Sequence, residues 1–271
     1  MKSADALIIG AGHGGVECAI TLRTKGFAGS IALLCDEQQL PYERPPLSKA
    51  MLAGTMEVER LRLRAETIYA KNRIELALGR RVEHLDPAAG TATTTGGEAW
   101  AYKHCVIATG ARARRLPQPD GPGVFAIRSI DDVLAMRTAL QPGKRLLVLG
   151  GGYLGLEAAC TAAALGARVH VIEASPIIMS GRVSEVTARR MHALHLEKGV
   201  TITTDARVAS WECTDNGWRA LSTDGALHLA DIVLVAIGAT PNIEFAEAAG
   251  LACDGGILVD DTCRSSAANV F

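Results

Sequence analysis

Two glycine-rich turns are the part of the chain whose residue types and spacing could do chemistry. Residues 10–15 read Gly-Ala-Gly-His-Gly-Gly, and residues 150–155 read Gly-Gly-Gly-Tyr-Leu-Gly. Both fit the pattern GxGxxG, in which backbone N–H groups and the positive end of a helix face a pyrophosphate. One such turn alone is a weak signal, because any tight connection from a strand to a helix favours glycine. The residues around each turn therefore decide what it means.

Each glycine of the first turn has its own expected role. Gly10 makes the tight turn, Gly12 lets a phosphate approach the backbone, and Gly15 lets helix and strand pack closely. Asp36 stands at the end of the next apolar run, about 20 residues further on, where an acid can hold a ribose hydroxyl. Glu37 is the alternative acid. We expect this turn to bind a dinucleotide.

The second turn repeats the arrangement with Gly150, Gly152 and Gly155. Glu173 follows the apolar run 169–172. A carboxylate at this position accepts hydrogen bonds from the ribose hydroxyls and repels a 2′-phosphate. The second turn is therefore expected to prefer NADH over NADPH. The alternative is an ordinary solvated acid at the end of a strand.

The elements that position these residues also occur twice. An apolar run at residues 6–9 leads into the first turn, and a helical pattern then leads to a second apolar run at 31–34. The same order appears as 146–149, then 156–165, then 169–172. Each copy describes a βαβ unit, and the copies lie about 140 residues apart. The sequence predicts an α/β protein with two Rossmann-like dinucleotide-binding domains.

The segment between the two copies predicts a small antiparallel meander. Its strands are expected at residues 82–85, 91–95 and 98–101, separated by proline and glycine. The densest cluster of breakers, and the expected crossing into the second domain, is Pro117, Pro119, Gly121, Pro122 and Gly123. A second crossing is expected near residues 238–241. The first domain is then discontinuous, residues 1–114 and 240–271, with the second domain, residues 115–239, inserted in it.

Composition narrows the function further. The 271 residues carry a formal net charge of −1, so no electrostatic drive toward nucleic acid or anionic membranes is expected. No apolar run approaches the roughly 20 residues of a spanning helix, and we expect a cytoplasmic protein. The seven cysteines form no CxxC pair and have no histidine at metal-ligand spacing, which predicts reduced thiols and no metal site.

Further segments carry a family resemblance. Residues 40–49 read Leu-Pro-Tyr-Glu-Arg-Pro-Pro-Leu-Ser-Lys, and residues 105–112 read Cys-Val-Ile-Ala-Thr-Gly-Ala-Arg. Together with the two glycine turns and the strand and turn at 232–242, they match in order along the whole chain. The chain resembles the FAD-dependent NADH:ferredoxin and rubredoxin reductase family, putidaredoxin reductase-like, which serves aromatic-ring dioxygenase and cytochrome P450 systems.

The resemblance implies FAD at the first turn and NADH at the second. It places Lys49 near flavin N5, with Glu157 of the second domain paired to it across the domain boundary, and Arg44 on the FAD phosphates. The other FAD positions, besides Gly10, Gly12 and Gly15, are Gly14, Asp36, Val82, Thr109, Gly110 and Arg128. The NAD positions are Gly150, Gly152, Tyr153, Leu154, Gly155, Glu157, Glu173 and Gly238.

The reaction that the resemblance implies is hydride transfer from NADH to FAD, followed by single-electron transfer to a ferredoxin- or rubredoxin-type iron–sulfur protein. Two alternatives stay open. An NADH oxidase or disulfide reductase would need a cysteine facing the flavin, and neither Cys18 nor Ser48 suits that role. A redox-sensing flavoprotein like apoptosis-inducing factor would bind NADH and turn over slowly.

In the family, an aspartate that binds the flavin ribityl chain and a C-terminal covering domain follow the position of Phe271. We therefore expect the 271-residue form to have a truncated first domain, to bind FAD poorly and to show doubtful activity.

Overall fold

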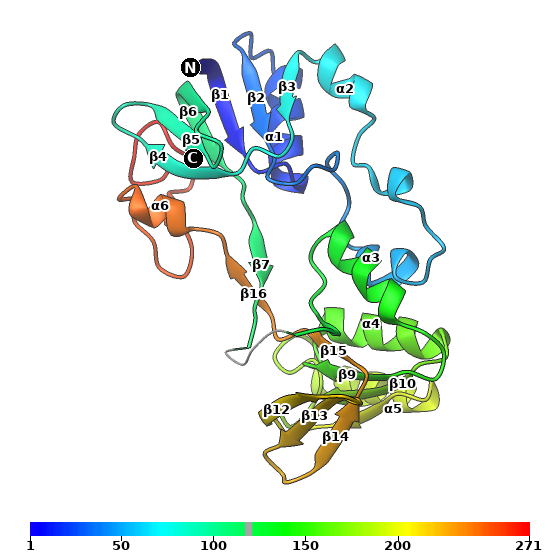
Figure 1. Ribbon diagram of the computed structural model, residues 1–271. Coiled ribbons are helices and arrows are strands. Elements are labelled where there is room, and N and C mark those ends of the chain that lie inside the picture. The colour runs from blue at the N-terminus through cyan, green and yellow to red at the C-terminus, as the bar shows by residue number, and fades with distance from the viewer. Residues whose placement is uncertain (117–120) are drawn as a thin grey trace. The chain divides into compact units, whose positions relative to one another are not determined.

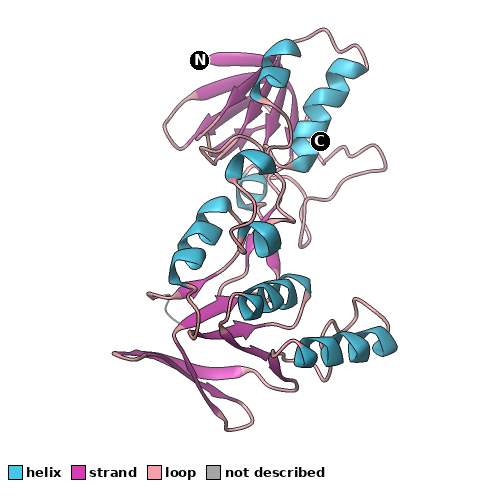
Figure 2. Ribbon diagram, turned by 90° about the vertical axis from the view of Figure 1, so that its right-hand side faces the viewer, coloured by secondary structure: helices cyan, strands magenta, loops and turns pink. Residues whose placement is uncertain are grey.

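The computed structural model of the protein describes residues 1–116 and 121–271. Its backbone contacts divide the chain into two units, and in each the strands gather into sheets with helices packed beside them (Figure 1, Figure 2). The first unit comprises Met1–Glu43, Leu61–Arg112 and Pro241–Phe271. The second comprises Arg44–Arg60 and Ala113–Thr240.

A six-stranded sheet forms the first unit, in the order β3-β2-β1-β6-β5-β4. Its strands are β1 (Lys2–Ile9), β2 (Ile31–Leu34), β3 (Ile74–Ala77), β4 (Val82–Asp86), β5 (Thr91–Thr94) and β6 (Ala99–Ile107). All four residues of β2 are buried, as expected for a parallel strand covered on both faces. The predicted meander is confirmed, but its third strand is longer, because apolar residues carry β6 on into a parallel pairing with β1.

The helices of the first unit are α1 (His13–Thr24), α2 (Glu66–Lys71) and α6 (Glu244–Ala248). Val16 and Ala19 are the buried face of α1 and pack with Ile8 and Leu33 of the sheet. The glycine turn before α1 is therefore fixed between a buried strand and a buried helix face. The short helix η2 (Val58–Leu61) carries the chain back into this unit.

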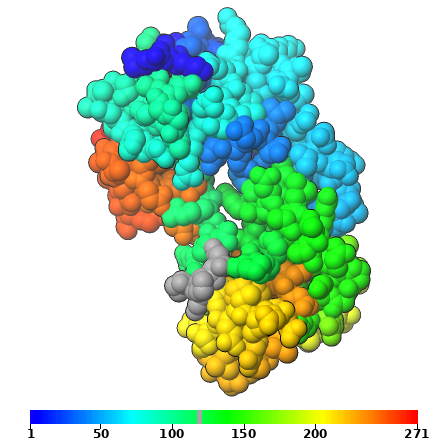
Figure 3. All heavy atoms as spheres, viewed as in Figure 1, coloured from blue at the N-terminus to red at the C-terminus, as the bar shows by residue number. Residues whose placement is uncertain are grey.

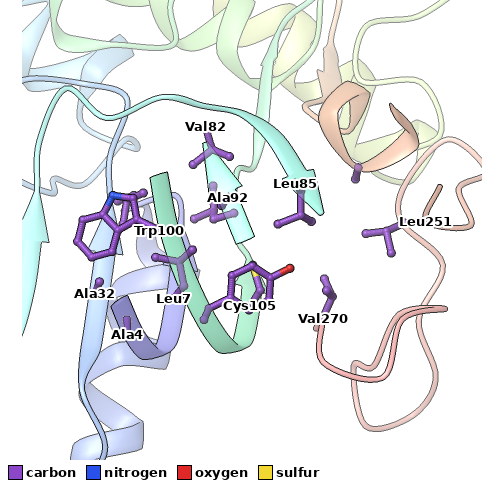
Figure 4. Close-up of a cluster of buried hydrophobic side chains, with 14 residues drawn as sticks. Ala4, Leu7, Ala32, Val82, Leu85, Ala92, Trp100, Cys105, Leu251 and Val270 are labelled. Atoms are coloured by element: carbon purple, nitrogen blue, oxygen red, sulfur yellow. The ribbon is translucent and has the colours of Figure 1, made fainter. Parts of the chain in front are cut away.

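The end of the chain closes the first unit. Along β6, the strand β5 covers only the part Ala99–Ala101. Residues 269–271 lie beside the later part of β6, where the N–H of Ile107 donates to the carbonyl of Phe271 at 2.8 Å. Figure 3 shows the longer closing segment, residues 241–271 in orange to red, lying against the meander. Its side chains Leu251 and Val270 join the buried cluster of Leu85, Trp100 and Cys105 (Figure 4).

The second unit contains a parallel five-stranded sheet in the order β11-β10-β9-β15-β8. Its strands are β8 (Val124–Phe125), β9 (Arg145–Leu149), β10 (Arg168–Ile172), β11 (Thr201–Thr203) and β15 (Ile232–Val235). Its helices are α3 (Ile130–Ala139), α4 (Tyr153–Ala164) and α5 (Glu185–Glu197). An antiparallel three-stranded sheet, β12 (Val208–Thr214), β13 (Gly217–Ser222) and β14 (Leu227–Ala230), packs on it through a cluster that includes Trp211 and Trp218.

The chain passes between the units in two strands that pair with each other, β7 (Ala111–Ala113) and β16 (Ala239–Pro241). The first crossing therefore falls between Arg112 and Ala113, before the cluster of breakers that the sequence favoured. The crossing is fixed by the backbone pairing of β7 with β16. Such pairing cannot be recognised from the positions of proline and glycine in the sequence. Within that cluster, Pro117 and Pro119 lie outside the described residues.

A further difference concerns residues 44–60, which carry the short π-helix η1 (Leu47–Met51). The predicted boundaries include this segment in the first domain, whereas its contacts place it in the second unit, against α3 and α4. Leu47, Ser48 and Met51 are its buried residues. Compact units and nucleotide-binding domains are separate divisions of a chain, so the boundaries 1–114, 115–239 and 240–271 stay a prediction.

Candidate dinucleotide-binding sites

Two positions of the first glycine turn can hold only glycine. Gly10 has a φ of +105°, and a Cβ there would lie 2.3 Å from the carbonyl oxygen of Ala108. A Cβ on Gly15 would lie 1.9 Å from the carbonyl oxygen of Gly10. These contacts are far below van der Waals distance, so the strand end, the turn and α1 come together because side chains are absent.

The remaining glycines of this turn border open space. Apart from adjacent residues and the backbone of α1 itself, no described atom lies within 4 Å of a Cβ built on Gly12 or on Gly14. Gly12 is also the N-cap of α1, and no described side chain caps that helix. The first N–H groups of a helix need acceptors, and together with the helix dipole they favour an anion. The structure therefore fits a phosphate group at this turn.

The second glycine turn has the same geometry. Gly150 has a φ of +108°, and a Cβ there would lie 2.5 Å from the carbonyl oxygen of Ala236. A Cβ on Gly152 would meet Arg182 Nε at 3.8 Å as its nearest described atom. No side chain in the described part of the chain caps α4, which starts at this turn. The helices α3 and α5, which follow no glycine turn, are capped by Ser129 and Ser184.

A cavity of about 450 Å³ lies beside the first turn, inside the first unit. Four residues predicted to contact FAD line it, namely Gly10, Asp36, Val82 and Thr109. The side chain of Asn242 donates to the carbonyl of Thr109 at 3.1 Å, and the Thr109 hydroxyl donates to the carbonyl of Asn242 at 2.8 Å. These two bonds fix the chain at Gly110, where φ is +64°.

A second cavity, of about 430 Å³, lies beside the second turn, inside the second unit. It is lined by Gly150, Gly152, Glu173 and Gly238 of the predicted NAD positions. Tyr153 and Leu154 do not line this cavity. Tyr153 has 52% of its surface exposed at the start of α4.

The carboxylate of Glu173 is held by the backbone on both oxygens. Its Oε2 accepts from the N–H of Gly151 at 2.6 Å, and its Oε1 accepts from the N–H of Ser175 at 2.7 Å. Such charge-assisted bonds are short and strong. Glu173 is thus a fixed carboxylate in the cavity wall, directly beside the glycine turn.

Lys49 and Glu157 form the ion pair that the resemblance implied, with 2.7 Å between Nζ and Oε2. Both residues belong to the second unit, because the segment around Lys49 packs on α4, so the pair does not join two units. Lys49 Nζ also donates to the carbonyl of Pro45 at 2.9 Å.

Arg44 and Arg128 also belong to the second unit, whereas the first glycine turn belongs to the first unit. The guanidinium of Arg44 donates to the carbonyl of Arg128. The N–H of Arg128 in turn donates to Asp132 in the first turn of α3, at 2.9 Å. The structure brings these two predicted FAD residues together.

Several residues of the cavity walls were not predicted from the sequence. In the first cavity they include Arg80, Asn242 and Phe245, and in the second they include Arg182 and Arg207. Asn242 ends the segment 232–242 that carries part of the family resemblance, and this is the signal that could have found it. The two arginines of the second cavity lie on loops and carry no such signal.

Burial disfavours the thiolate form of three cysteines. Burial raises the pKa of Cys35 to about 11 and that of Cys105 to about 12, and it raises the pKa of Cys18 in α1 as well. A raised pKa disfavours the thiolate, which is the reactive form. All seven cysteines fall within the described residues and are free thiols. Among the described residues, no group of three or more His, Cys, Asp or Glu side chains could hold a metal ion.

Two βαβ units, each with a glycine turn, an uncapped helix and an acid lining a cavity, define a protein with two dinucleotide-binding folds. The family model for pyridine nucleotide-disulphide oxidoreductases matches residues 4–271, and the chain belongs to this family.

Known relatives agree with this assignment. Rhodocoxin reductase of Rhodococcus erythropolis is 37% identical over 267 residues, which cover 97% of this chain and 62% of the relative. Rubredoxin-NAD(+) reductase of Pseudomonas putida is 36% identical over 269 residues, covering 98% of this chain and 70% of the relative. The crystal structure of the covalent putidaredoxin reductase–putidaredoxin complex aligns with a TM-score of 0.94 and 34% identity, covering 99% of this chain and 66% of that chain. The chain thus spans about two thirds of the length of the proteins that it matches.

Proposed function

We propose that the protein is a flavoprotein reductase that moves electrons from NADH, through FAD, to a ferredoxin- or rubredoxin-type iron–sulfur protein. The observation that carries the proposal is the repetition, within one chain, of a glycine turn, an uncapped helix and an acid-lined cavity. The flavin, when bound, would supply the exchange between two-electron and one-electron chemistry. The names of the relatives, rhodocoxin reductase and rubredoxin-NAD(+) reductase, support this acceptor class for them, and we extend it to this chain.

The first unit would hold FAD. The open space at Gly12 and Gly14 would admit the pyrophosphate, which would accept from the N–H groups at the start of α1. Asp36, in the wall of the same cavity, would accept from a ribose hydroxyl. Val82, Thr109 and Gly110 would line the path of the cofactor.

The second unit would hold NADH in the same manner. The pyrophosphate would lie at Gly152 and the start of α4, with Gly155 and Gly238 bordering the site. Glu173, fixed by its two backbone bonds, would accept from the ribose. Tyr153 and Leu154 would lie next to the dinucleotide on the first turn of α4.

The catalytic role is proposed for Lys49, with Glu157 as its partner. The ammonium of Lys49 would stabilise negative charge near flavin N5, and Arg44 and Arg128 would contact the FAD phosphates. The support for these roles is the family resemblance, because these residues and the first glycine turn belong to different units.

The proposal includes a location in the cytoplasm, which the free thiols support. Within residues 1–116 and 121–271, no helix is long and apolar enough to cross a membrane.

An acceptor panel tests the function. The protein is assayed with NADH and a large excess of FAD, because weak FAD binding is expected of the 271-residue form, and with a ferredoxin, a rubredoxin, a disulfide or molecular oxygen as acceptor. Fast NADH oxidation that depends on either iron–sulfur protein is expected. Fast oxidation with oxygen or the disulfide alone would instead indicate an oxidase or a disulfide reductase. Binding of NADH with slow turnover on every acceptor would indicate a redox sensor.

A further inference from the structure

The residue before Lys49 touches the same carboxylate that Lys49 does. Ser48 is buried, with 4% of its surface exposed, and its hydroxyl donates to Glu157 Oε2 at 2.6 Å. Lys49 Nζ lies 2.7 Å from that same oxygen. One carboxylate oxygen of α4 therefore accepts from two adjacent residues of η1.

This geometry depends on the backbone at Lys49. In a regular helix adjacent side chains do not face one another, so they would not reach one oxygen. At Lys49 the backbone leaves the helical region, with φ −118° and ψ −108°. This change of backbone direction lets the Lys49 side chain reach Glu157 Oε2, the oxygen that also accepts from Ser48.

The two donors differ in how firmly they can hold Glu157. The side chain of Lys49 is 48% exposed and that of Glu157 is 33% exposed. An exposed ion pair on a long flexible side chain fixes geometry poorly, because its charges are screened and ordering the side chain costs entropy. The Ser48 hydroxyl is short and buried, and it donates to a charged acceptor, so its bond is the firmer one.

We infer that Ser48 is a positioning residue for the Lys49–Glu157 pair. Its hydroxyl holds the Glu157 carboxylate in place, and through that carboxylate it holds the lysine ammonium where hydride transfer would need it. The inference rests on the proposed function, which assigns the chemistry to Lys49. It adds that the serine of the Leu-Ser-Lys run acts in the reaction and does more than pack.

Thr161 provides a matched control. Its hydroxyl lies 2.9 Å from the carbonyl of Ser48 and 2.9 Å from the carbonyl of Glu157, so it also ties η1 to α4. It does not touch the carboxylate oxygen that Lys49 contacts. Thr161→Val removes one hydroxyl from the same junction at nearly constant volume.

The test compares Ser48→Ala and Thr161→Val in the FAD-loaded protein, with NADH mixed in by stopped flow. Ser48→Ala should slow flavin reduction about tenfold to a hundredfold, the effect of losing one charge-assisted bond, with less than a twofold change in NADH affinity. Thr161→Val should change the rate less than twofold. In a Glu157→Ala background, Ser48→Ala should have no further effect, because its only route to the reaction is gone.

A structural measurement, which does not depend on catalysis, accompanies the rate measurements. A crystal structure of the Ser48→Ala protein should show the Lys49 Nζ to Glu157 Oε2 distance beyond 4 Å, the limit for an ion pair. If that variant does not fold, Ser48→Cys keeps the volume with a weaker donor and should show the same slowing. An unchanged rate, an equal loss in Thr161→Val, or additive losses with Glu157→Ala would overturn the inference.

Lys49→Met separates this inference from the proposed function. Reduction at the wild-type rate in Lys49→Met would remove the role of the pair itself. A slow Lys49→Met protein beside a Ser48→Ala protein with the wild-type rate would remove only the role of Ser48.

Discussion

The carboxylate of Glu173 accepts a hydrogen bond from the backbone N–H of Gly151, with 2.6 Å between Oε2 and N. This bond fixes a negative charge beside the glycine turn, in the wall of the second cavity. A 2′-phosphate bound there would meet that charge, whereas a ribose hydroxyl could donate to it. We expect NADH to bind about tenfold or more tightly than NADPH.

Fluorescence titration of the protein with NADH and with NADPH measures this preference. Glu173→Gln should narrow the difference mainly by improving NADPH binding. Glu197→Gln removes the same charge from the exposed end of α5 and should leave the preference unchanged. Equal affinities in the wild-type protein would contradict the role of Glu173.

The ion pair of Lys49 and Glu157 leads to a kinetic prediction. Lys49→Met should slow flavin reduction by NADH more than it weakens NADH binding, because the proposed charge acts at the flavin and away from the nicotinamide nucleotide phosphates. Glu157→Ala should give a related defect, and the double variant should lose less than the sum of the two. Stopped-flow reduction with titrated NADH separates rate from affinity. Additive losses would show that the two residues act separately.

The two kinds of glycine in the first turn should respond oppositely to alanine. Gly10→Ala should destabilise the first unit by about 1–3 kcal/mol or more, because φ is +105° and the Cβ would lie 2.3 Å from a carbonyl oxygen. Gly12→Ala should fold normally, since no described atom apart from those of adjacent residues lies within 4 Å of its Cβ, but it should weaken FAD binding.

Thermal unfolding and FAD titration distinguish the two effects. Gly96→Ala places the same methyl group in open space between β5 and β6 and should alter neither. A Gly12→Ala protein that binds FAD as the wild type does would show that the pyrophosphate does not approach the backbone there.

Asp231 should make stability depend on acid pH. Hydrogen bonds from the Arg145 guanidinium lower the pKa of Asp231 to about 2 from 3.8. A lowered folded-state pKa contributes stability above pH 3.8, and that contribution disappears as the pH falls through about 2. Because its side chain is 22% exposed, we expect Asp231→Asn to cost about 1–2 kcal/mol at pH 6.

Urea unfolding at pH 6, 4 and 3 measures that difference. The difference in the free energy of unfolding between the wild type and Asp231→Asn should become smaller toward pH 3. Arg145→Met should give a similar loss at pH 6, since the two side chains share one ion pair, with 2.8 Å between Nη2 and Oδ1. An equal difference in the free energy of unfolding at all three pH values would show that the ion pair does not lower the pKa of Asp231.

Local pattern was enough to predict the elements that carry the glycine turns. The runs 6–9 and 146–149 are buried strand ends, and the glycines that were expected to turn tightly have a positive φ, as at Gly10 and Gly150. These features depend on neighbours in sequence and on the period of apolar residues, which a single sequence displays.

Contacts between distant segments were not predictable in the same way. Ser48 meets Glu157 across 109 positions, and Thr109 meets Asn242 across 133, and no spacing rule links either pair. The placement of residues 44–60 in the second unit depends on such contacts, which is why the sequence assigned them to the first domain. The family resemblance indicated the Lys49–Glu157 pair, but it did not indicate that both residues lie in one unit.

The most direct test of the account follows the flavin itself. The protein is reconstituted with FAD under anaerobic conditions, at protein and FAD concentrations high enough to offset the weak binding expected of this form. It is mixed first with NADH and then with an oxidised ferredoxin or rubredoxin, while absorbance near the flavin maximum is recorded. We predict rapid bleaching with NADH and recovery of the colour on addition of the iron–sulfur protein. Absence of bleaching with NADH, or bleaching that no iron–sulfur acceptor reverses, would contradict the proposed reductase function.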